Sequence, residues 1–293
     1  MKVNPILRRE AKVKMRNWRA PFLIGIYVAI LGVITAFMFY NTVMDPLQYR
    51  FNSDALIDTY VFIAVMQFLL IAFIVPALTS SSISGERERQ TLDLLLCTKL
   101  KPRSIILGKL LTSISLIILL IIAALPVFSF IFLIGGISFK EIFQLFIYYI
   151  VLSITFGSIG IFFSTYIKKT TVSTVLTYGV ILFLMLGTLM ISIFYLSIKA
   201  KVNSDIQNNT LSIMYFNPVT AFISLVMDQF GKGSGLSIPG IYDFSYGSSG
   251  PLFKSMSIWQ INIIVNLIIS LTLLSLSVRK LNPMKVRNIK KLF

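Results

Sequence analysis

Six long stretches of the chain carry almost no charged side chain, and this pattern limits the fold more than any other feature of the sequence. An α-helix of about 20 apolar residues spans the roughly 30 Å hydrocarbon core of a bilayer, and each stretch is long enough to do so. The whole chain is 56% apolar and only 13% charged, as expected for an integral membrane protein. We therefore predict an all-α membrane protein in which residues 1–293 form a single transmembrane domain. The six predicted spans are residues 21–44, 59–84, 105–134, 142–167, 170–198 and 257–278.

The distribution of Lys and Arg predicts the orientation of these spans. Most of the 27 basic residues lie before the first span, between the second and third, between the fourth and fifth, and after the sixth. The positive-inside rule then places both termini in the cytoplasm and residues 199–256 outside the cell. These flanking bases explain the formal net charge of +16, so we expect contact with membrane lipid and no nucleic-acid binding. The first span is too long for the core of a signal peptide and is expected to stay in the mature protein.

The residue types present argue against catalysis by this chain. It has no histidine and a single cysteine, Cys97, which removes Ser-His and Cys-His catalysis, histidine-containing zinc sites and an intramolecular disulfide. The central parts of the spans hold no ionisable residue, whereas proton- and ion-coupled carriers keep such groups there. We expect a protein that is not an enzyme, binds no cofactor or metal, and draws on an energy source outside the chain.

Two segments outside the predicted spans have helical patterns of their own. Residues 1–20 place apolar and basic side chains at helical spacing, with Trp18 near the membrane, and are predicted to lie as a helix along the inner leaflet. Residues 211–226 are uncharged, but a span there would put the basic C-terminal residues outside. We interpret them as a short helix that begins at Pro218 and lies in the outer leaflet, while re-entrant and spanning arrangements of residues 211–230 stay open.

Polar side chains within the spans are candidates for a translocation pathway. Gln67 lies in the second span, and Thr174, Thr177 and Tyr178 lie in the fifth. Residues of these types also form hydrogen bonds between membrane helices, and that interpretation is the more common one.

Small residues and prolines predict features of helix packing. The spacings from Ser153 to Gly157 and from Gly160 to Ser164 in the fourth span allow neighbouring helices to approach closely. Pro76 and Pro126 are expected to kink the second and third spans.

A charged cytoplasmic segment, residues 85–103, joins the second and third spans. Ser84 is suited to cap a helix whose first turn carries Glu86 and Glu88, and Lys101-Pro102 is expected to end this segment. We expect the alternating charges on its exposed face to be solvated or to meet a partner, because such pairs stabilise a helix by only a few tenths of a kcal/mol. A phosphate-binding loop ending at Gly108-Lys109 is excluded, since Arg103 stands where that loop needs glycine.

This segment resembles a motif of the permease subunits of type-2 ATP-binding-cassette exporters. The resemblance covers the whole chain, and its specific part is Gly85-Glu86-Arg87-Glu88-Arg89-Gln90-Thr91-Leu92-Asp93-Leu94-Leu95-Leu96, followed by Gly108-Lys109. In that family the segment is a coupling helix that docks on a separate ATPase subunit. The resemblance implies that Gly85, Glu86, Arg87, Glu88, Arg89 and Thr91 belong to the ATPase-coupling surface, and that Leu92, Leu95 and Leu96 seat the helix on the bundle.

The resemblance also implies an assembly. Two ATPase subunits, which hold the ATP and Mg²⁺, would work with this chain and a second permease subunit as a homodimer or heterodimer. The leading hypothesis is a multi-pass permease of a bacterial cell membrane that exports a peptide, an antibiotic, a lipid or another amphiphile. The alternative is a membrane scaffold or sensor that recruits a cytoplasmic partner without transport.

Overall fold

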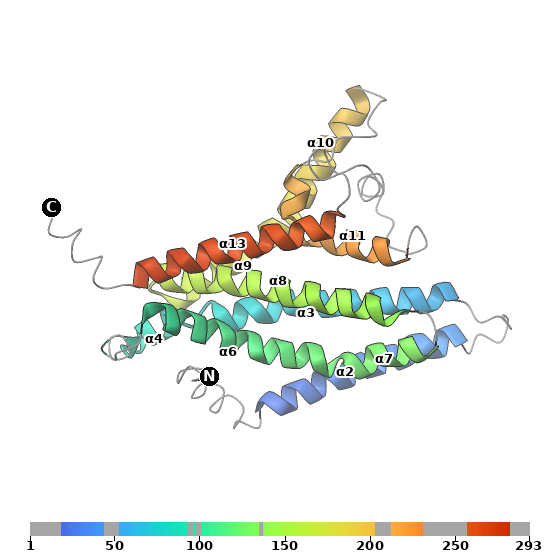
Figure 1. Ribbon diagram of the computed structural model, residues 1–293, viewed down its shortest axis with the longest axis horizontal. Coiled ribbons are helices and arrows are strands. Elements are labelled where there is room, and N and C mark those ends of the chain that lie inside the picture. Colours follow the sequence, from blue (N-terminus) through green and yellow to red (C-terminus); the bar gives the residue numbers. More distant parts are fainter. Residues whose placement is uncertain are drawn as a thin grey trace.

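A computed structural model describes residues 19–43, 53–92, 97, 101–134, 137–202, 212–230 and 257–281, and these residues contain helices and no strand (Figure 1). The predicted inner-leaflet helix, apart from residues 19 and 20, lies outside them. The helices are α2 (Arg19–Val43), α3 (Ser53–Thr79), α4 (Ser84–Glu88), α6 (Pro102–Ala123), α7 (Leu125–Ile134), α8 (Phe139–Tyr166), α9 (Thr170–Leu182), the π-helical turn η1 (Phe183–Gly187), α10 (Thr188–Val202), the 3₁₀ helix η2 (Ser212–Phe216), α11 (Pro218–Phe230) and α13 (Ile258–Leu281).

Five helical segments of the described residues are long and apolar enough to cross a membrane, as the apolar stretches predict. They are Leu56–Glu88, Pro102–Leu133, Phe139–Tyr166, Thr170–Tyr195 and Ile258–Leu281. The helix α2 covers the first predicted span, but its apolar segment of described side chains is the shorter Ile24–Phe37. The chain is thus a multi-pass membrane protein, while the count of six spans and their orientation stay predictions.

The helix α8 lies at the centre of the bundle, because small residues let its neighbours approach closely. It contacts α3, α6, α9, α11 and α13. A Cβ atom added to Gly160 would lie 2.8 Å from the Cβ of Thr79 in α3, closer than real side chains come. Gly157 faces Val75 and Thr79 in ordinary van der Waals contact. The predicted close approach at these glycines is confirmed, and it brings the end of α3 against α8.

The prolines affect the second and third spans differently. The third span is broken, with α6 ending at Ala123 and α7 starting at Leu125, one residue before Pro126. Proline cannot donate the backbone hydrogen bond that would continue the helix, which explains the break. Pro76 lies inside α3 without ending it. The segment 85–103 ends as predicted, because α6 begins at Pro102.

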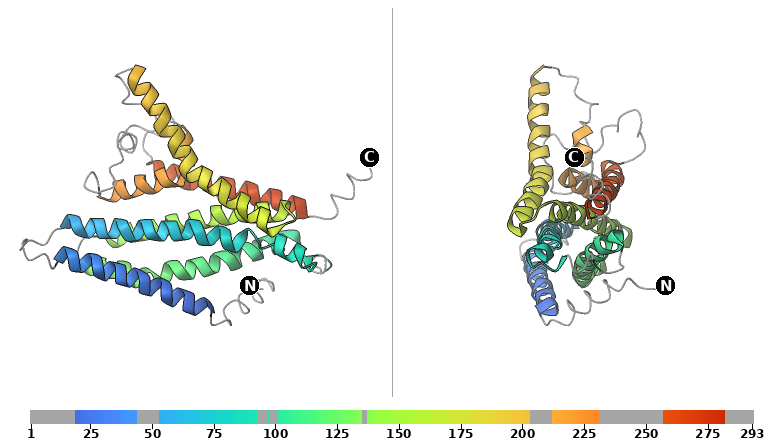
Figure 2. Two further views of the ribbon diagram at one scale, coloured as in Figure 1. Left: turned by 180° about the vertical axis from the view of Figure 1, so that it is seen from behind. Right: turned by 90° about the vertical axis from the view of Figure 1, so that its left-hand side faces the viewer.

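The fifth span differs from the rest of the bundle. It consists of α9, the π-turn η1 and α10, and Figure 2 shows its second half leaning away from the other helices. Of the five candidate spans it is the least buried, whereas α8 is the most buried. The short helix α11 begins at Pro218 as predicted, but it is buried between α8 and α13 rather than lying on the bundle surface.

Candidate functional site

The short helix α4 follows α3 after a turn and is held there by a serine of α8. The Ser164 hydroxyl accepts hydrogen bonds from the backbone N–H groups of Ile83 (2.8 Å) and Ser84 (2.9 Å), two donors that a helix start otherwise leaves unpaired. The expected cap at Ser84 is therefore wrong. Ser84 is the first residue of α4, its hydroxyl donates to the Ser80 carbonyl, and the capping oxygen comes from a residue 80 positions away.

The helix is shorter than predicted because it closes in a two-bond turn. The backbone N–H of Thr91 donates to the carbonyl of Glu86 (2.9 Å), and that of Gln90 donates to the carbonyl of Arg87 (3.1 Å). This pair is the Schellman motif, which needs a left-handed residue at the position that Gln90 occupies with φ of 57°. Glycine or asparagine is usual there, so the sequence shows little sign of this helix end.

Glu86 forms a salt bridge with Lys109 of α6. The Lys109 Nζ lies 2.6 Å from Glu86 Oε1 and also donates to the Ser82 carbonyl at 2.7 Å. The Lys109 side chain is 5% exposed and that of Glu86 is 25% exposed. A buried ammonium needs an acceptor for its charge, and this pair provides one. Glu86 thus connects α4 to α6 instead of lying on a solvated charged face.

Arg87 connects α4 to the end of α8. Its guanidinium donates to the carbonyl oxygens of Thr165 (3.1 Å) and Ile167 (3.2 Å). The last carbonyls of a helix have no partner within the helix and carry partial negative charge, so a cation there satisfies both needs.

Glu88 connects α4 to the beginning of α9. Its carboxylate accepts hydrogen bonds from the backbone N–H of Thr170 at 2.8 Å and from the Thr170 hydroxyl at 2.9 Å. These bonds, and to a smaller extent the charge of Lys169, hold the pKa of Glu88 below its ordinary value. Glu88 acts as the N-terminal cap of a helix that begins 82 residues later in the chain.

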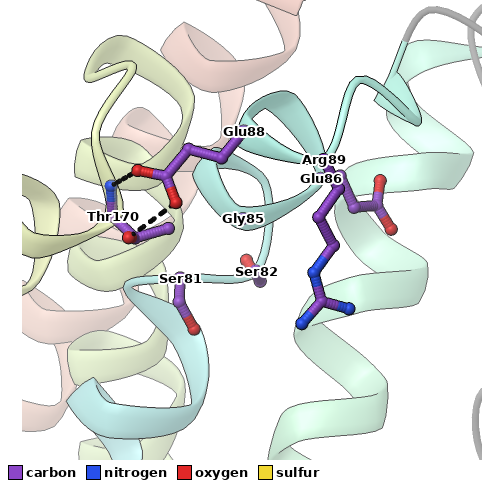
Figure 3. A pocket seen from close by; sticks show the side chains of 7 residues that line it. All are labelled: Ser81, Ser82, Gly85, Glu86, Glu88, Arg89 and Thr170. Atoms are coloured by element: carbon purple, nitrogen blue, oxygen red, sulfur yellow. Dashed lines mark hydrogen bonds between the residues drawn. The ribbon is translucent and has the colours of Figure 1, made fainter.

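The helix α4 and the turn before it border a polar pocket of about 410 Å³ on the bundle surface (Figure 3). Its lining residues are Ser81, Ser82, Gly85, Glu86, Glu88, Arg89 and Thr170. Arg89 is exposed, and Figure 3 shows its side chain extending in a different direction from the Glu86 carboxylate. Of the four predicted charged residues, three bind to other helices and Arg89 presents its charge outward.

The remaining residues of the predicted coupling segment are described only in part. The side chain of Leu92 is 5% exposed and packs in an apolar cluster with Ile83, Ile105, Ile106, Leu110, Ile114, Ile161 and Leu281. The Thr91 hydroxyl donates to the carbonyl of Glu86 at 3.2 Å. Leu95 and Leu96 lie outside the described residues.

Two of the three candidate pathway residues of the fifth span contact the second span. The hydroxyl oxygens of Thr174 and Ser80 lie 2.9 Å apart, and the Tyr178 hydroxyl donates to the carbonyl of Phe73 at 2.6 Å. Thr177 is fully buried and donates to the carbonyl of Ser173 in its own helix. Thr174 and Tyr178 thus form hydrogen bonds between the second and fifth spans, which is the more common role of such residues in membrane helices.

Gln67 is separate from the other three pathway candidates. It is fully buried in α3, and neither its amide nitrogen nor its amide oxygen has a hydrogen-bond partner among the described residues. A buried carboxamide without partners is costly, so this residue differs from the threonines and the tyrosine.

Sequence reasoning missed three groups that position α4. They are Ser164 on α8, Lys109 on α6 and Thr170 on α9, which accept or donate the bonds described above. The sequence does carry a signal for the role of Lys109, because a lysine one residue before an apolar stretch needs an acceptor once that stretch is buried. It carries no such signal for Ser164 and Thr170, since nothing local distinguishes them from other hydroxyl residues.

Comparison with known proteins shows the family. The family model described as ABC-2 family transporter protein matches residues 5–278, which is most of the chain. No curated protein matches this sequence. Permeases of this family are the membrane components of ABC transporters and generally work with ABC ATPase partners. With its bundle of apolar helices and its match over residues 5–278, the chain belongs to the ABC-2 transporter family and is a transport permease.

Proposed function

We propose that this permease is the membrane subunit of an ATP-driven exporter and that α4 is the element on which a separate ATPase subunit docks. The observation that carries the proposal is the set of bonds around α4. The helix continues from α3, is bound to α6 through Glu86, to α8 through Arg87, and to α9 through Glu88. A displacement of α4 by a partner is therefore passed to four helices of the bundle.

The contacts around α4 support different roles for its charged residues. Glu86, Arg87 and Glu88 are positioning residues, because their charged groups bind other helices of the same chain. Arg89 is the candidate contact for the ATPase, because it is exposed beside the polar pocket. A surface that presents a guanidinium with nearby hydroxyl groups is suited to a partner that offers carboxylates or free helix carbonyls.

Affinity purification from native membranes tests this assignment. The full chain is extracted in a mild detergent, co-purified proteins are identified by mass spectrometry, and ATP hydrolysis of the eluate is measured. We expect a stoichiometric ATPase that is lost or strongly depleted with Arg89→Ala. The matched control is Lys140→Ala, an exposed basic residue in the first turn of α8. An eluate without any ATPase would contradict the proposal and favour the scaffold.

The predicted orientation can be tested with the single cysteine. Cys97 is exposed and lies between α4 and α6, on the side that we propose to be cytoplasmic. A membrane-impermeant maleimide should label it only after the cells are permeabilised. In a Cys97→Ser background, Lys140→Cys should be labelled in intact cells. The reverse pattern would place α4 outside the cell and exclude a cytoplasmic ATPase as its partner.

The second permease subunit is proposed to pack along the fifth span. This span is the least buried of the five, and large apolar side chains such as Phe183, Met190 and Phe194 are exposed along it. Disulfide cross-linking of Phe194→Cys in a Cys97→Ser background tests the homodimer, and a second permease in the affinity eluate would identify a heterodimer.

The cargo is proposed to be a peptide, an antibiotic, a lipid or another amphiphile, because the central parts of the spans lack ionisable groups.

A further inference from the structure

The fifth span contains a π-turn whose shape depends on a glycine. In η1 the backbone N–H of Thr188 bonds to the carbonyl of Phe183, five residues earlier, so the turn holds one residue more than an α-helical turn. The Phe183 ring covers Gly187, where an added Cβ would lie only 2.7 Å from a ring carbon. Such a turn loosens the regular carbonyl ladder and leaves backbone groups that a neighbour must satisfy.

The neighbour that satisfies this turn is Asn217, which lies between η2 and α11. Its amide nitrogen donates to the carbonyl of Met185 at 3.1 Å and to the hydroxyl of Thr188 at 2.7 Å. Its amide oxygen accepts from the backbone N–H groups of Val219 (2.7 Å) and Thr220 (3.3 Å), and so caps α11. Both ends of one carboxamide, which is 1% exposed, are thereby used on two different helices.

Further contacts extend this link to the sixth span. The Asn262 amide of α13 donates to the carbonyl of Tyr215 at 2.7 Å, and Asn266 donates to the Asn262 oxygen at 2.6 Å. Leu189 of α10 packs against Ile223 and Met227 of α11. The π-turn, the start of α11 and α13 are joined by neutral amides, which can be buried without the cost of burying a charge.

We propose that Asn217 is a conformational latch that holds the π-turn and thereby fixes the direction in which α10 leaves the bundle. When the hydrogen bonds from its amide nitrogen to Met185 and Thr188 break, the π-turn loses its side-chain support and can return to α-helical geometry. This return shifts the register of the helix by one residue, and it therefore rotates everything beyond the turn by about 100° around the helix axis. The exposed face of α10 then turns relative to α11 and α13. The proposal concerns motion within this chain and does not depend on the ATPase or the cargo.

The decisive variant is Asn217→Asp, which keeps the capping oxygen and the size of the side chain but removes the amide donor. Asn217→Ser also keeps a capping oxygen and is uncharged, so it serves if the aspartate variant fails to fold. Spin labels are attached at Phe194→Cys on α10 and Phe143→Cys on α8, in a Cys97→Ser background. The distance between these two labels, here called the external pair, is measured in lipid nanodiscs. Both positions are exposed. We expect this distance distribution to shift by several ångströms or to broaden at least twofold in either variant.

A second label pair distinguishes a latch from a general stabilising residue. Val175→Cys on α9 and Leu107→Cys on α6 lie on exposed surfaces on the other side of the π-turn. The latch predicts that this pair keeps its wild-type distribution. An unchanged external pair, or equal broadening of both pairs, would overturn the proposal.

The glycine offers an independent check on the same turn. Gly187→Ala should clash with Phe183 and shift the external pair in the same direction as Asn217→Asp. Adding Phe183→Ala removes the clashing ring and should restore the wild-type distance in part. A Gly187→Ala chain with the wild-type external distance would contradict the role of the π-turn.

Discussion

The beginning and the middle of the fifth span are held by different chemistry. At its beginning, α9 is capped by the ionised carboxylate of Glu88, next to the ion pair of Glu86 and Lys109. Beyond its middle, the π-turn is held by the neutral amide of Asn217. The charged contacts lie beside the exposed residues Glu88 and Arg89, whereas the amide of Asn217 is buried. The position in the bundle decides whether a charged or a neutral group can hold the helix, because an unpaired charge is far more costly to bury than an amide.

The two regions also differ in what they join. Around α4, three charged side chains reach from one short helix to three long ones, so the site gathers the spans at one place. Around Asn217, one side chain holds a turn within a span and the start of a neighbouring helix. In our proposals, the first arrangement transmits a displacement by a docked partner, and the second controls the shape of one helix. The predictions that follow test this division.

The largest effect is expected for Lys109→Met. Removing one partner of a buried ion pair leaves an uncompensated charge, and we expect a loss of about 3 kcal/mol of stability, below the top of the usual range because Glu86 is partly exposed. Thermal unfolding of the purified chain in detergent measures the change. Combining Lys109→Met with Glu86→Gln should recover part of the loss. A single variant as stable as the wild type would show that the pair does not hold α4.

Asn217→Ala should cost less, about 2 kcal/mol, because it removes a helix cap and leaves the buried carbonyl of Met185 with one donor fewer. The same unfolding measurement applies. Asn217→Ser keeps an uncharged capping oxygen, so the difference between Asn217→Ala and Asn217→Ser reports the contribution of the cap to α11. The loss should be insensitive to salt, because no charge takes part. A marked dependence on ionic strength would contradict the distinction between the two regions.

The sequence predicts the helices better than the contacts between them. Apolar stretches that lack charge identify the long helices, Pro218 marks a helix start correctly, and Pro102 marks the end of the charged segment, because these signals are local. The partner of Glu86 is not local. Helical spacing points to Arg89 three residues on, but the structure pairs Glu86 with Lys109, 23 residues away on another helix. A pattern read along one helix cannot contain that information.

The shape of α4 and of the fifth span had weak signals for a similar reason. Gln90 takes a left-handed conformation that the sequence gives no reason to expect, so the helix is shorter than its sequence predicts. The π-turn follows from Phe183 lying over Gly187 and from a distant asparagine, and a single glycine in an apolar stretch does not predict it. The burial of Leu92 is easier to predict, since a leucine stripe is expected to face the bundle, and the Leu92 side chain is indeed buried.

A stabilising change is expected at the end of α4. Gln90 has φ of 57°, a conformation that glycine adopts without the steric cost of a Cβ atom. Gln90→Gly should therefore stabilise the chain by about 0.5–1 kcal/mol, after the larger flexibility of glycine in the unfolded chain is subtracted. Gln90→Ala removes the same side chain but keeps the Cβ, and its stability should match the wild type. Equal unfolding temperatures for all three chains would show that this turn is not strained.

The smallest effect concerns the pH dependence of Glu88. Its carboxylate accepts two hydrogen bonds from Thr170, which lower its pKa in the folded chain. A lowered pKa means that its contribution to stability is fully present above the pKa of the unfolded chain and is lost as the pH falls through the lower, folded value. The wild type should unfold at a higher temperature than Glu88→Gln at neutral pH, and this difference should disappear in acid.

Because Glu88 is exposed, the difference should be small and should shrink in salt, in contrast to that of Asn217. Thr170→Val sharpens the test, since it removes the hydroxyl donor but keeps the backbone N–H. In a Thr170→Val background, the difference between Glu and Gln at position 88 should be reduced without being abolished. A difference that stays constant from neutral to acidic pH would mean that the charge of Glu88 does not cap α9. The fifth span would then depend on the amide of Asn217 alone for a specific polar contact at its turn, and its beginning would be held by packing and by the hydroxyl contacts of Ser173 and Thr174 with Ser80.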